Sequence, residues 1–305
     1  MVRRQYDKSE LVKYNEGNPN CDSLNDKIIL LHFDSFCLGD SICFASFIDN
    51  FIDYHKPKYV YITTFLRHIF ESNNDKVEFI SSTDNSRVLE IDKMINVGYD
   101  KSDLDHTLGG MLYATKDTMF LPQNLKPSKV PVVPKSRNIV NNKITIAPET
   151  LKTIAEWDDK KWQLLVNILV ENGYEVFNVS YEDRIKLDNV IDIHGFDDIN
   201  VSLQHILDSR LFIGLSSGLA WLSWSYNVPV VMISGFTKKH NEFDCYRVIS
   251  EVGCNGCFNV FKNPSSNCPI FENTDRSNEC SKLITVDMVI NQINKALSEN
   301  PFNGV

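Results

Sequence analysis

Short apolar runs alternate with amphipathic stretches along most of the chain. Residues 27–33 (KIILLHF) form a continuous apolar run, which is typical of a strand buried on both faces of a parallel sheet. A Gly-Asp pair follows at Gly39 and Asp40, and apolar residues at helical spacing then predict a helix over residues 41–54. This succession of strand, tight turn and helix is the opening of an α/β domain.

The same alternation continues to the end of the chain. Residues 127–143 interrupt it, because they hold three prolines and no helical period, and they predict a linker. Residues 103–116 allow no assignment. The other expected elements are strands at 58–64, 77–80, 94–97, 144–147, 175–179, 190–193, 211–214 and 228–233, and helices at 65–72, 160–172, 201–209, 217–226 and 286–297.

Two such runs of strands and helices predict two doubly wound, Rossmann-like α/β domains that face a cleft. We place the N-terminal domain at residues 1–130, the linker at 131–143 and the C-terminal domain at 144–285, followed by a last helix and tail at 286–305. Because ligands of such sheets bind at the carboxyl ends of the strands, the cleft is the expected site.

The cysteines are unevenly distributed. The chain has eight, and five of them fall between Cys245 and Cys280. Four of them follow the spacing C-x2-C-x10-C-x11-C: Cys254, Cys257, Cys268 and Cys280. This spacing predicts a tetrahedral metal finger over residues 254–280, with zinc as the default ion and iron also suited. Unrelated buried cysteines and a redox Cys-x-x-Cys pair are the alternatives.

Charge and hydropathy exclude several classes of protein. The formal net charge of −9 argues against a broadly basic surface for nucleic acid. No apolar run approaches the roughly 20 residues of a membrane span, and the basic start of the chain has no apolar stretch behind it. We therefore expect a cytoplasmic protein whose thiols stay reduced.

Three strand–loop junctions carry candidate chemistry. Asp40 follows the first strand at a helix start, where it is either a base for an acceptor hydroxyl or a plain helix N-cap. Loop residues Thr150 and Lys152 are candidates to contact a donor phosphate. A further strand-to-helix turn consists of Ser216, Ser217, Gly218 and Leu219. It either offers backbone N–H groups and hydroxyls to a phosphate or is an ordinary capped turn.

Residues 213–257 resemble the C-terminal domain of the bacterial autotransporter heptosyltransferases, which are related to glycosyltransferase family 9. The resemblance is carried by the motifs SSGL, MISGF, YRVI and the four cysteines, and it extends more thinly to the turn FCLGD at residues 36–40. It implies a GT-B fold, an inverting mechanism, a nucleotide-heptose donor and an iron ion on the four cysteines.

The resemblance also assigns roles to single residues. It makes Asp40 the base and Glu182 a contact of the nucleotide ribose, and it places the donor diphosphate at residues 216–218. The family has a phosphate-binding lysine two residues before a tryptophan, but Ala155 stands at that position before Trp157, so Lys152 is the candidate replacement.

The sequence thus predicts an inverting glycosyltransferase that moves a sugar from a nucleoside-diphosphate sugar to an acceptor hydroxyl. The acceptor is a protein serine or a saccharide, with a hydroxymethylated nucleic-acid base as a further alternative. We expect no catalytic divalent ion, because the helix start takes its place. Rival functions are a non-catalytic metal-knuckle module and a GT-B epimerase or phosphorylase.

Overall fold

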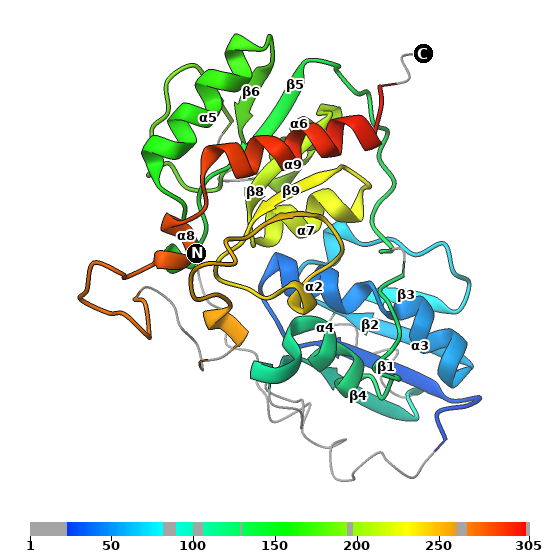
Figure 1. Cartoon of the computed structure of the whole chain (residues 1–305). Helices are drawn as coiled ribbons and strands as arrows, with labels where there is room; N and C mark the ends of the chain where they lie inside the picture. The colour runs from blue at the N-terminus through cyan, green and yellow to red at the C-terminus, as the bar shows by residue number, and fades with distance from the viewer. Residues whose placement is uncertain are drawn as a thin grey trace.

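The computed structural model describes residues 23–81, 90–99, 106–128, 130–193, 198–259, 261 and 267–302. Two parallel sheets occupy the lower and upper halves of Figure 1. The N-terminal sheet has the order β3-β2-β1-β4, with β1 at Ile28–Phe33, β2 at Tyr59–Thr63, β3 at Val77–Ile80 and β4 at Lys93–Val97. The continuous apolar run of β1 accordingly lies inside this sheet and not at its edge.

The C-terminal sheet is also parallel throughout. Its order is β10-β9-β8-β5-β6-β7. The strands are β5 (Lys143–Ala147), β6 (Glu175–Asn178), β7 (Ile191–Asp192), β8 (Leu211–Leu215), β9 (Val230–Ile233) and β10 (Tyr246–Val248). The α/β class with parallel sheets is therefore confirmed.

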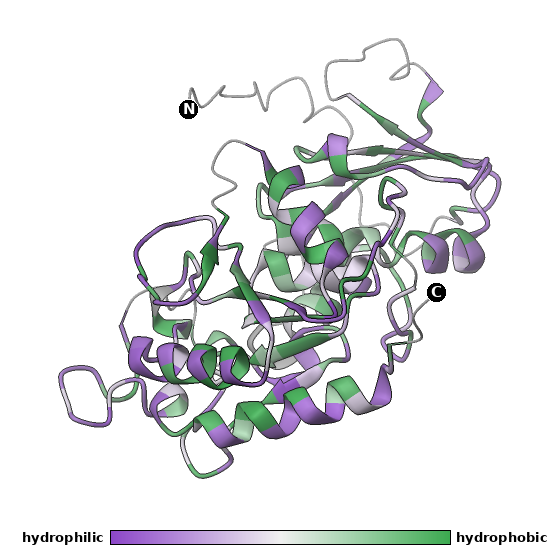
Figure 2. Cartoon of the chain, turned by 90° about the horizontal axis from the view of Figure 1, so that it is seen from above, coloured by the Kyte–Doolittle hydropathy of each residue, from purple (hydrophilic) through white to green (hydrophobic). Residues whose placement is uncertain are grey.

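The helices also follow the predicted alternation. They are α2 (Leu38–Ala45), α3 (Ile48–His55), α4 (His106–Thr118), α5 (Asp159–Glu171), α6 (Ile199–Asp208), α7 (Gly218–Ser225), α8 (Glu279–Lys282) and α9 (Val286–Glu299). Local chemistry sets their ends: Asp158 accepts the N–H groups of Lys160 and Lys161 at the start of α5, and Gly173 takes a positive φ just after its end. Figure 2 shows green and purple side by side along the helices, as expected when one face is buried.

The single helix predicted over residues 41–54 is wrong, because the structure has two helices that meet at Ser46 and Phe47. The hydroxyl of Ser46 donates to the Cys43 carbonyl at 2.7 Å, and both the N–H and the hydroxyl of Ser128 donate to the Ser46 carbonyl. The backbone groups that would continue α2 are therefore used elsewhere.

Four other segments differ from the prediction. The helix expected over residues 65–72 is only a 3-10 turn at Arg67–Ile69. Residues 103–116, for which the sequence allows no assignment, overlap most of α4, which is broken at Gly110 by a φ of 66°. Strand β10 and helix α8 were not foreseen, because the first is three residues long and the second four.

Helices α2 and α7 cross at two glycines. A Cβ atom on Gly39 would lie 3.0 Å from Cδ1 of Trp221 and 3.5 Å from Cα of Gly218. A Cβ atom on Gly218 would lie 2.9 Å from Cβ of Leu38. Only glycine at both positions lets the two helix starts come so close.

The main apolar core runs through this crossing. It joins buried residues of the N-terminal sheet, such as Leu31 and Phe33, to Trp221 and Met232 of the C-terminal half. The two halves therefore share one core, and the domain limits drawn at residues 130 and 143 stay a prediction. Among the described residues, no helix combines the length and the apolar character of a membrane span.

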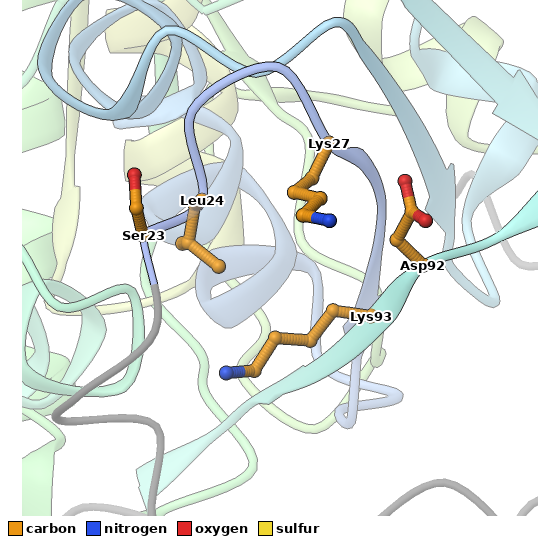
Figure 3. Close-up of a pocket in the computed structure, with 5 residues that line it drawn as sticks. All are labelled: Ser23, Leu24, Lys27, Asp92 and Lys93. Carbon is orange, nitrogen blue, oxygen red and sulfur yellow. The ribbon is translucent and has the colours of Figure 1, made fainter.

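A surface cavity of about 470 Å³ lies at the amino ends of β1 and β4 (Figure 3). Lys27, Asp92 and Lys93 line it together with Ser23 and Leu24, and the Asp92 carboxylate accepts the N–H of Ile28 at 2.8 Å. Asp40 follows the carboxyl end of β1. The cavity is thus at the opposite end of the N-terminal sheet from the predicted base.

The glycine crossing generates a stability prediction. Gly218→Ala should lower the free energy of unfolding by about 1–3 kcal/mol, because the added methyl group overlaps Leu38 in a packed core. Thermal unfolding followed by circular dichroism measures the loss. Gly173→Ala is the comparison, since its Cβ would meet nothing within 4 Å and its loss of stability reflects the positive φ alone. Unchanged stability of Gly218→Ala would contradict tight packing at the crossing.

Candidate active site

Asp40 lies in the first turn of α2, and both of its carboxylate oxygens accept hydroxyl protons. Ser35 donates to Oδ2 at 2.6 Å and Tyr99 donates to Oδ1 at 2.9 Å. The N-cap position of α2 is Cys37, so the reading of Asp40 as a helix N-cap is wrong. The carboxylate is instead held in one orientation from the carboxyl ends of β1 and β4.

The surroundings of Asp40 disfavour its charged form. Burial raises the pKa of the Asp40 carboxyl above its ordinary value, against the lowering effects of the Ser35 and Tyr99 hydroxyls and of the Lys152 ammonium. Burial and the Asp40 charge raise the pKa of Tyr99 well above its usual range, so Tyr99 keeps its proton as a donor. A carboxylate with a raised pKa, fixed by two donors, has the character of a general base.

Lys152 reaches the same site from the other sheet. It lies in the loop after β5, and its charge acts on both Asp40 and the exposed thiol of Cys37. The Lys152 ammonium is therefore near enough to Asp40 and Cys37 for its charge to act on them, and its predicted contact with a donor phosphate stays a prediction.

The turn between β8 and α7 lies beside Asp40 because Gly39 and Gly218 are in contact. Ser217 occupies the N-cap position of α7, and its side chain makes no capping hydrogen bond. Its buried hydroxyl oxygen has no hydrogen-bond partner among the described residues. The start of α7, which includes Leu219, thus has unused donors close to the Asp40 carboxylate.

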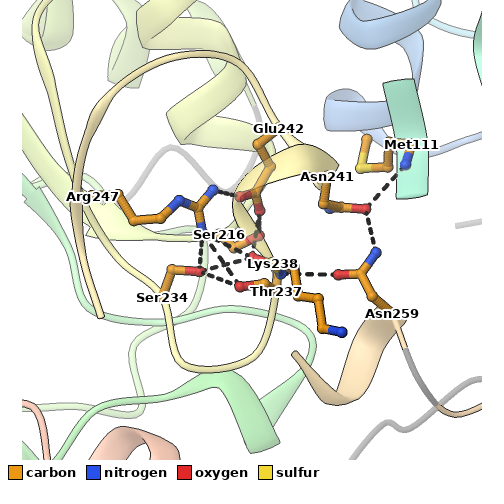
Figure 4. A network of polar contacts seen from close by, with 9 residues as sticks. All are labelled: Met111, Ser216, Ser234, Thr237, Lys238, Asn241, Glu242, Arg247 and Asn259. Atoms are coloured by element: carbon orange, nitrogen blue, oxygen red, sulfur yellow. Dashed lines mark hydrogen bonds and ion pairs between the residues drawn. The ribbon is translucent and has the colours of Figure 1, made fainter. Parts of the chain in front are cut away.

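The side chain of Ser216 is engaged within the protein, and its predicted contact with the donor diphosphate stays a prediction. Its hydroxyl donates to the carboxylate of Glu242, which is fully buried (Figure 4). The same carboxylate accepts the Thr237 hydroxyl at 2.8 Å and forms an ion pair with Arg247 of β10. Arg247 also donates to the Ser234 hydroxyl at 2.5 Å. The Ser216 side chain therefore anchors the turn between β8 and α7 to the buried Glu242 carboxylate.

A second part of this network reaches the N-terminal half of the chain (Figure 4). The side-chain oxygen of Asn241 accepts the backbone N–H of Met111 in α4 at 3.0 Å and the amide of Asn259 at 3.3 Å. Asn259 in turn accepts the N–H of Lys238 at 2.9 Å. The loop behind the Ser216 turn is thereby tied to α4 and to the segment that follows Cys257.

Glu182 and Thr150 meet through Arg184. The Glu182 carboxylate accepts Nε of Arg184 at 2.5 Å, and Nη2 of Arg184 donates to the Thr150 carbonyl at 3.1 Å and to Glu156 at 2.6 Å. These residues follow β5 and β6 at their carboxyl ends. The predicted ribose contact of Glu182 stays a prediction, and its carboxylate is paired in this structure.

The four cysteines of the predicted finger lie near enough for their charges to act on one another. Burial raises the pKa of Cys257 to about 12, and the charges of Cys280, Cys254 and Cys268 add to that rise. Gly256 takes a φ of 79° and donates its N–H to the Gly235 carbonyl at 3.0 Å, and Gly235 lies against Cys280. Among the described residues, however, no three His, Cys, Asp or Glu side chains are placed to hold one metal ion. The donor set suits a thiolate site, and the metal stays a prediction.

Four functional residues escaped the sequence reasoning: Ser35, Tyr99, Glu242 and Arg247. Tyr99 lies just after β4, and only the strand order places β4 beside β1. Arg247 stands in the quoted motif YRVI, but its partner Glu242 could be found only from the packing.

Comparisons with known proteins are consistent with this geometry. No sequence model of a known protein family matches the chain. The autotransporter heptosyltransferase Aah of Escherichia coli is 27% identical over 311 aligned positions, which cover 93% of this chain and 79% of Aah. The heptosyltransferase TibC of enterotoxigenic E. coli is 43% identical over 100 residues, 30% of this chain and 25% of TibC. The inactive heptosyltransferase BimC of Burkholderia thailandensis is 29% identical over 180 residues, 53% of this chain and 42% of BimC.

Solved structures show the same fold. TibC, described as an iron-containing dodecameric heptosyltransferase in complex with ADP-D-beta-D-heptose, covers 91% of this chain with a TM-score of 0.79 and 24% identity, and 78% of TibC is matched. A family 9 glycosyltransferase from Veillonella parvula covers 92% of this chain with a TM-score of 0.64 and 12% identity, over 99% of its own length. The curated homologues of this chain are therefore autotransporter heptosyltransferases, and its α/β fold is similar to that of the GT-B family 9 enzymes.

Proposed function

We propose that this chain transfers a heptose from ADP-heptose to an acceptor hydroxyl, with inversion at the anomeric carbon. The observation that carries the proposal is the contact of two helix starts, which sets the buried carboxylate of Asp40 beside the unused donors of α7. The ADP-heptose donor is taken from the ligand of the TibC structure. The acceptor hydroxyl belongs to a protein serine or to a saccharide.

The proposed reaction uses two charges on opposite sides of the anomeric carbon. Asp40 accepts the proton of the acceptor hydroxyl, and the oxygen forms a bond to the anomeric carbon from the face opposite the diphosphate. The bond between that carbon and the diphosphate oxygen breaks, and the leaving diphosphate gains the negative charge. The N–H groups of Gly218 and Leu219, the Ser217 hydroxyl and the Lys152 ammonium receive it.

The network behind Ser216 supports this role of the turn. A buried ion pair such as Arg247–Glu242 contributes little to stability by itself, because desolvation offsets the attraction. It does fix the direction of the Ser216 hydroxyl, and Arg247 neutralises a carboxylate that would otherwise repel a diphosphate. Thr150 and Glu182 are proposed to contact the rest of the nucleotide, which requires Glu182 to exchange part of its contact with Arg184.

Nucleotide binding and transfer test this function together. ADP at about 100 times its dissociation constant should stabilise the protein by about 2.7 kcal/mol, and UDP, GDP and CMP should stabilise it less. Asp40→Asn should keep the ADP shift and lose transfer by a factor of about 10²–10⁴. The exposed Asp53→Asn is the matched control. Near-normal transfer by folded Asp40→Asn would refute the proposed base, and no nucleotide shift would favour a non-catalytic module.

The pKa of Asp40 gives a pH prediction. A base must be deprotonated, so kcat/KM should fall as the pH drops through the raised pKa, on an acidic limb above that of an ordinary aspartate. Tyr99→Phe removes a hydrogen bond that lowers this pKa and should move the limb to higher pH. A pH–rate profile measures the shift, and an unmoved limb would show that Asp40 is not the titrating group.

The same shift sets the sign of a stability effect. Because the folded pKa of Asp40 lies above its unfolded value, the stabilisation from this group is complete below the unfolded pKa and is lost as the pH rises through the folded one. Asp40→Asn should consequently unfold at the same or a higher temperature at neutral pH. This makes the loss of activity separable from a loss of folding.

We also infer that Cys254, Cys257, Cys268 and Cys280 hold one metal ion, iron or zinc. TibC is described as iron-containing, and four thiolates suit either ion. The ion would hold the polar segment 254–280 in shape and supplies no step of the transfer.

Metal analysis tests this site. Protein purified without chelators should contain about one iron or zinc per chain by plasma mass spectrometry, and Cys280→Ser should lose it. Cys245→Ser is the control, because Cys245 lies outside the four-cysteine set. Metal-free wild-type protein, or an equal loss in both variants, would contradict the assignment.

A further inference from the structure

Asn241 and Glu242 are neighbours in the loop after β9, and both are buried polar residues, at 1% and 3% exposure. Figure 4 shows the Glu242 side chain beside Arg247 and the Asn241 side chain beside Met111. The Glu242 carboxylate accepts the hydroxyl of Ser216 in the turn before α7, whereas the Asn241 side-chain oxygen accepts the backbone N–H of Met111 in α4. One dipeptide thus contacts the candidate diphosphate turn and the N-terminal half of the chain.

The contact of Asn241 with α4 is made at the break in that helix. Gly110 has a φ of 66° and a ψ of −167°, so a new helical segment begins at Met111. The first N–H groups of a helix have no acceptor in a preceding turn, and an asparagine side-chain oxygen commonly supplies one. Here Asn241 supplies it to Met111 at 3.0 Å, from a position 130 residues further along the chain.

The fit around this break allows little displacement. A Cβ atom on Gly110 would lie 2.5 Å from Oδ1 and 2.9 Å from Cα of Asn241, and 3.0 Å from Nδ2 of Asn259. Asn259 is 1% exposed, donates to the Asn241 oxygen at 3.3 Å and accepts the N–H of Lys238 at 2.9 Å. Asn241 is therefore held by the segment after Cys257, and α4 lies directly against it.

Helix α4 also contacts the helix that bears the candidate base. The Thr115 hydroxyl donates to the Met111 carbonyl at 2.8 Å and lies 3.4 Å from the Cys43 thiol. Thr115 and Cys43 are both fully buried, and Cys43 lies one turn after Asp40 in α2. Because closely packed interiors transmit displacement, a shift of α4 is expected to shift or loosen α2.

We propose that Asn241 is a positioning residue for the transfer reaction: through α4 it sets Asp40 at a fixed distance from the α7 turn that Glu242 holds. The inference rests on the proposed transferase function and adds to it a residue that touches no substrate. The glycine crossing joins the two halves of the site at one point, and the Asn241 contact joins them at a second. Two contacts restrict rotation about either one, which an in-line attack requires.

A purely structural role is the alternative, because any buried asparagine costs stability when its hydrogen bonds are lost. Asn178 of β6 offers a matched control. It is equally buried at 1%, and its side-chain oxygen accepts the N–H of Ser180 at 3.1 Å. Ser180 and its other partner, Asp192, both belong to the C-terminal half of the chain. Asn178→Leu therefore removes a comparable set of hydrogen bonds without touching α4.

Hydrogen–deuterium exchange of the whole chain, read by mass spectrometry, tests the structural step. Asn241→Leu removes the oxygen and leaves the Met111 N–H without this acceptor. Amides of α2 and of α4 after Gly110 should exchange about tenfold faster than in the wild type, and those of α5 at an unchanged rate. Asn178→Leu should leave α2 and α4 unchanged.

Turnover tests the catalytic step. Release of ADP from ADP-heptose with water in place of the acceptor hydroxyl needs no assumption about the acceptor. Asn241→Leu should lower kcat about 10- to 100-fold. The Kd for ADP should stay within about twofold, because Glu242 still holds Ser216. Asn178→Leu should keep kcat within about twofold. Should Asn241→Leu not fold, Asn241→Ala, which cannot overpack the site, is expected to show the same pattern.

Several outcomes would overturn the proposal. Unchanged exchange of α2 and α4 in a folded Asn241 variant excludes the coupling, and an unchanged kcat excludes the positioning role. An equal fall of kcat in Asn178→Leu would show a general effect of lost stability instead. If the wild type neither binds ADP nor releases it from ADP-heptose, the transferase proposal fails and the positioning role fails with it, whatever the exchange shows.

Discussion

The close approach of Gly39 and Gly218 is the constraint on which the rest of the site depends. One glycine opens α2 beside the candidate base, and the other opens α7 beside the candidate diphosphate site. A methyl group at Gly218 would overlap Leu38, and one at Gly39 would crowd Trp221. Because the shared apolar core passes through this crossing, the force that folds the chain also holds the two halves of the site together.

The site is assembled at a cost to the surrounding structure. Asp40 is buried enough for its pKa to rise, and a fully buried Glu242 stands behind the phosphate turn. Each carboxylate is held by donors from separate elements: Ser35 and Tyr99 for the first, Arg247, Thr237 and Ser216 for the second. Buried carboxylates lower the stability of a protein, so a buried carboxylate that is held in one orientation is expected where function requires that orientation.

Much of this organisation could be predicted from the sequence, because the apolar runs and turn residues are strong local signals. Periodicity located the strands of both sheets with at least four residues, and position after a strand singled out Asp40, Lys152 and the Ser217 turn. The break at Ser46 could not be predicted, since it depends on Ser128 far along the chain. The partners Tyr99 and Glu242 depend on strand order and on loop packing, which a local pattern does not contain.

The diphosphate of the donor is proposed to sit on the start of α7 beside Asp40. Selective ¹⁵N labelling of the 13 glycines, with the Gly218 signal assigned by its loss in Gly218→Ala, tests it directly. If the diphosphate sits there, ADP will move the Gly218 amide signal strongly, adenosine will not, and the Gly173 signal will stay in place. Binding of ADP with no change at Gly218 would contradict this position of the diphosphate.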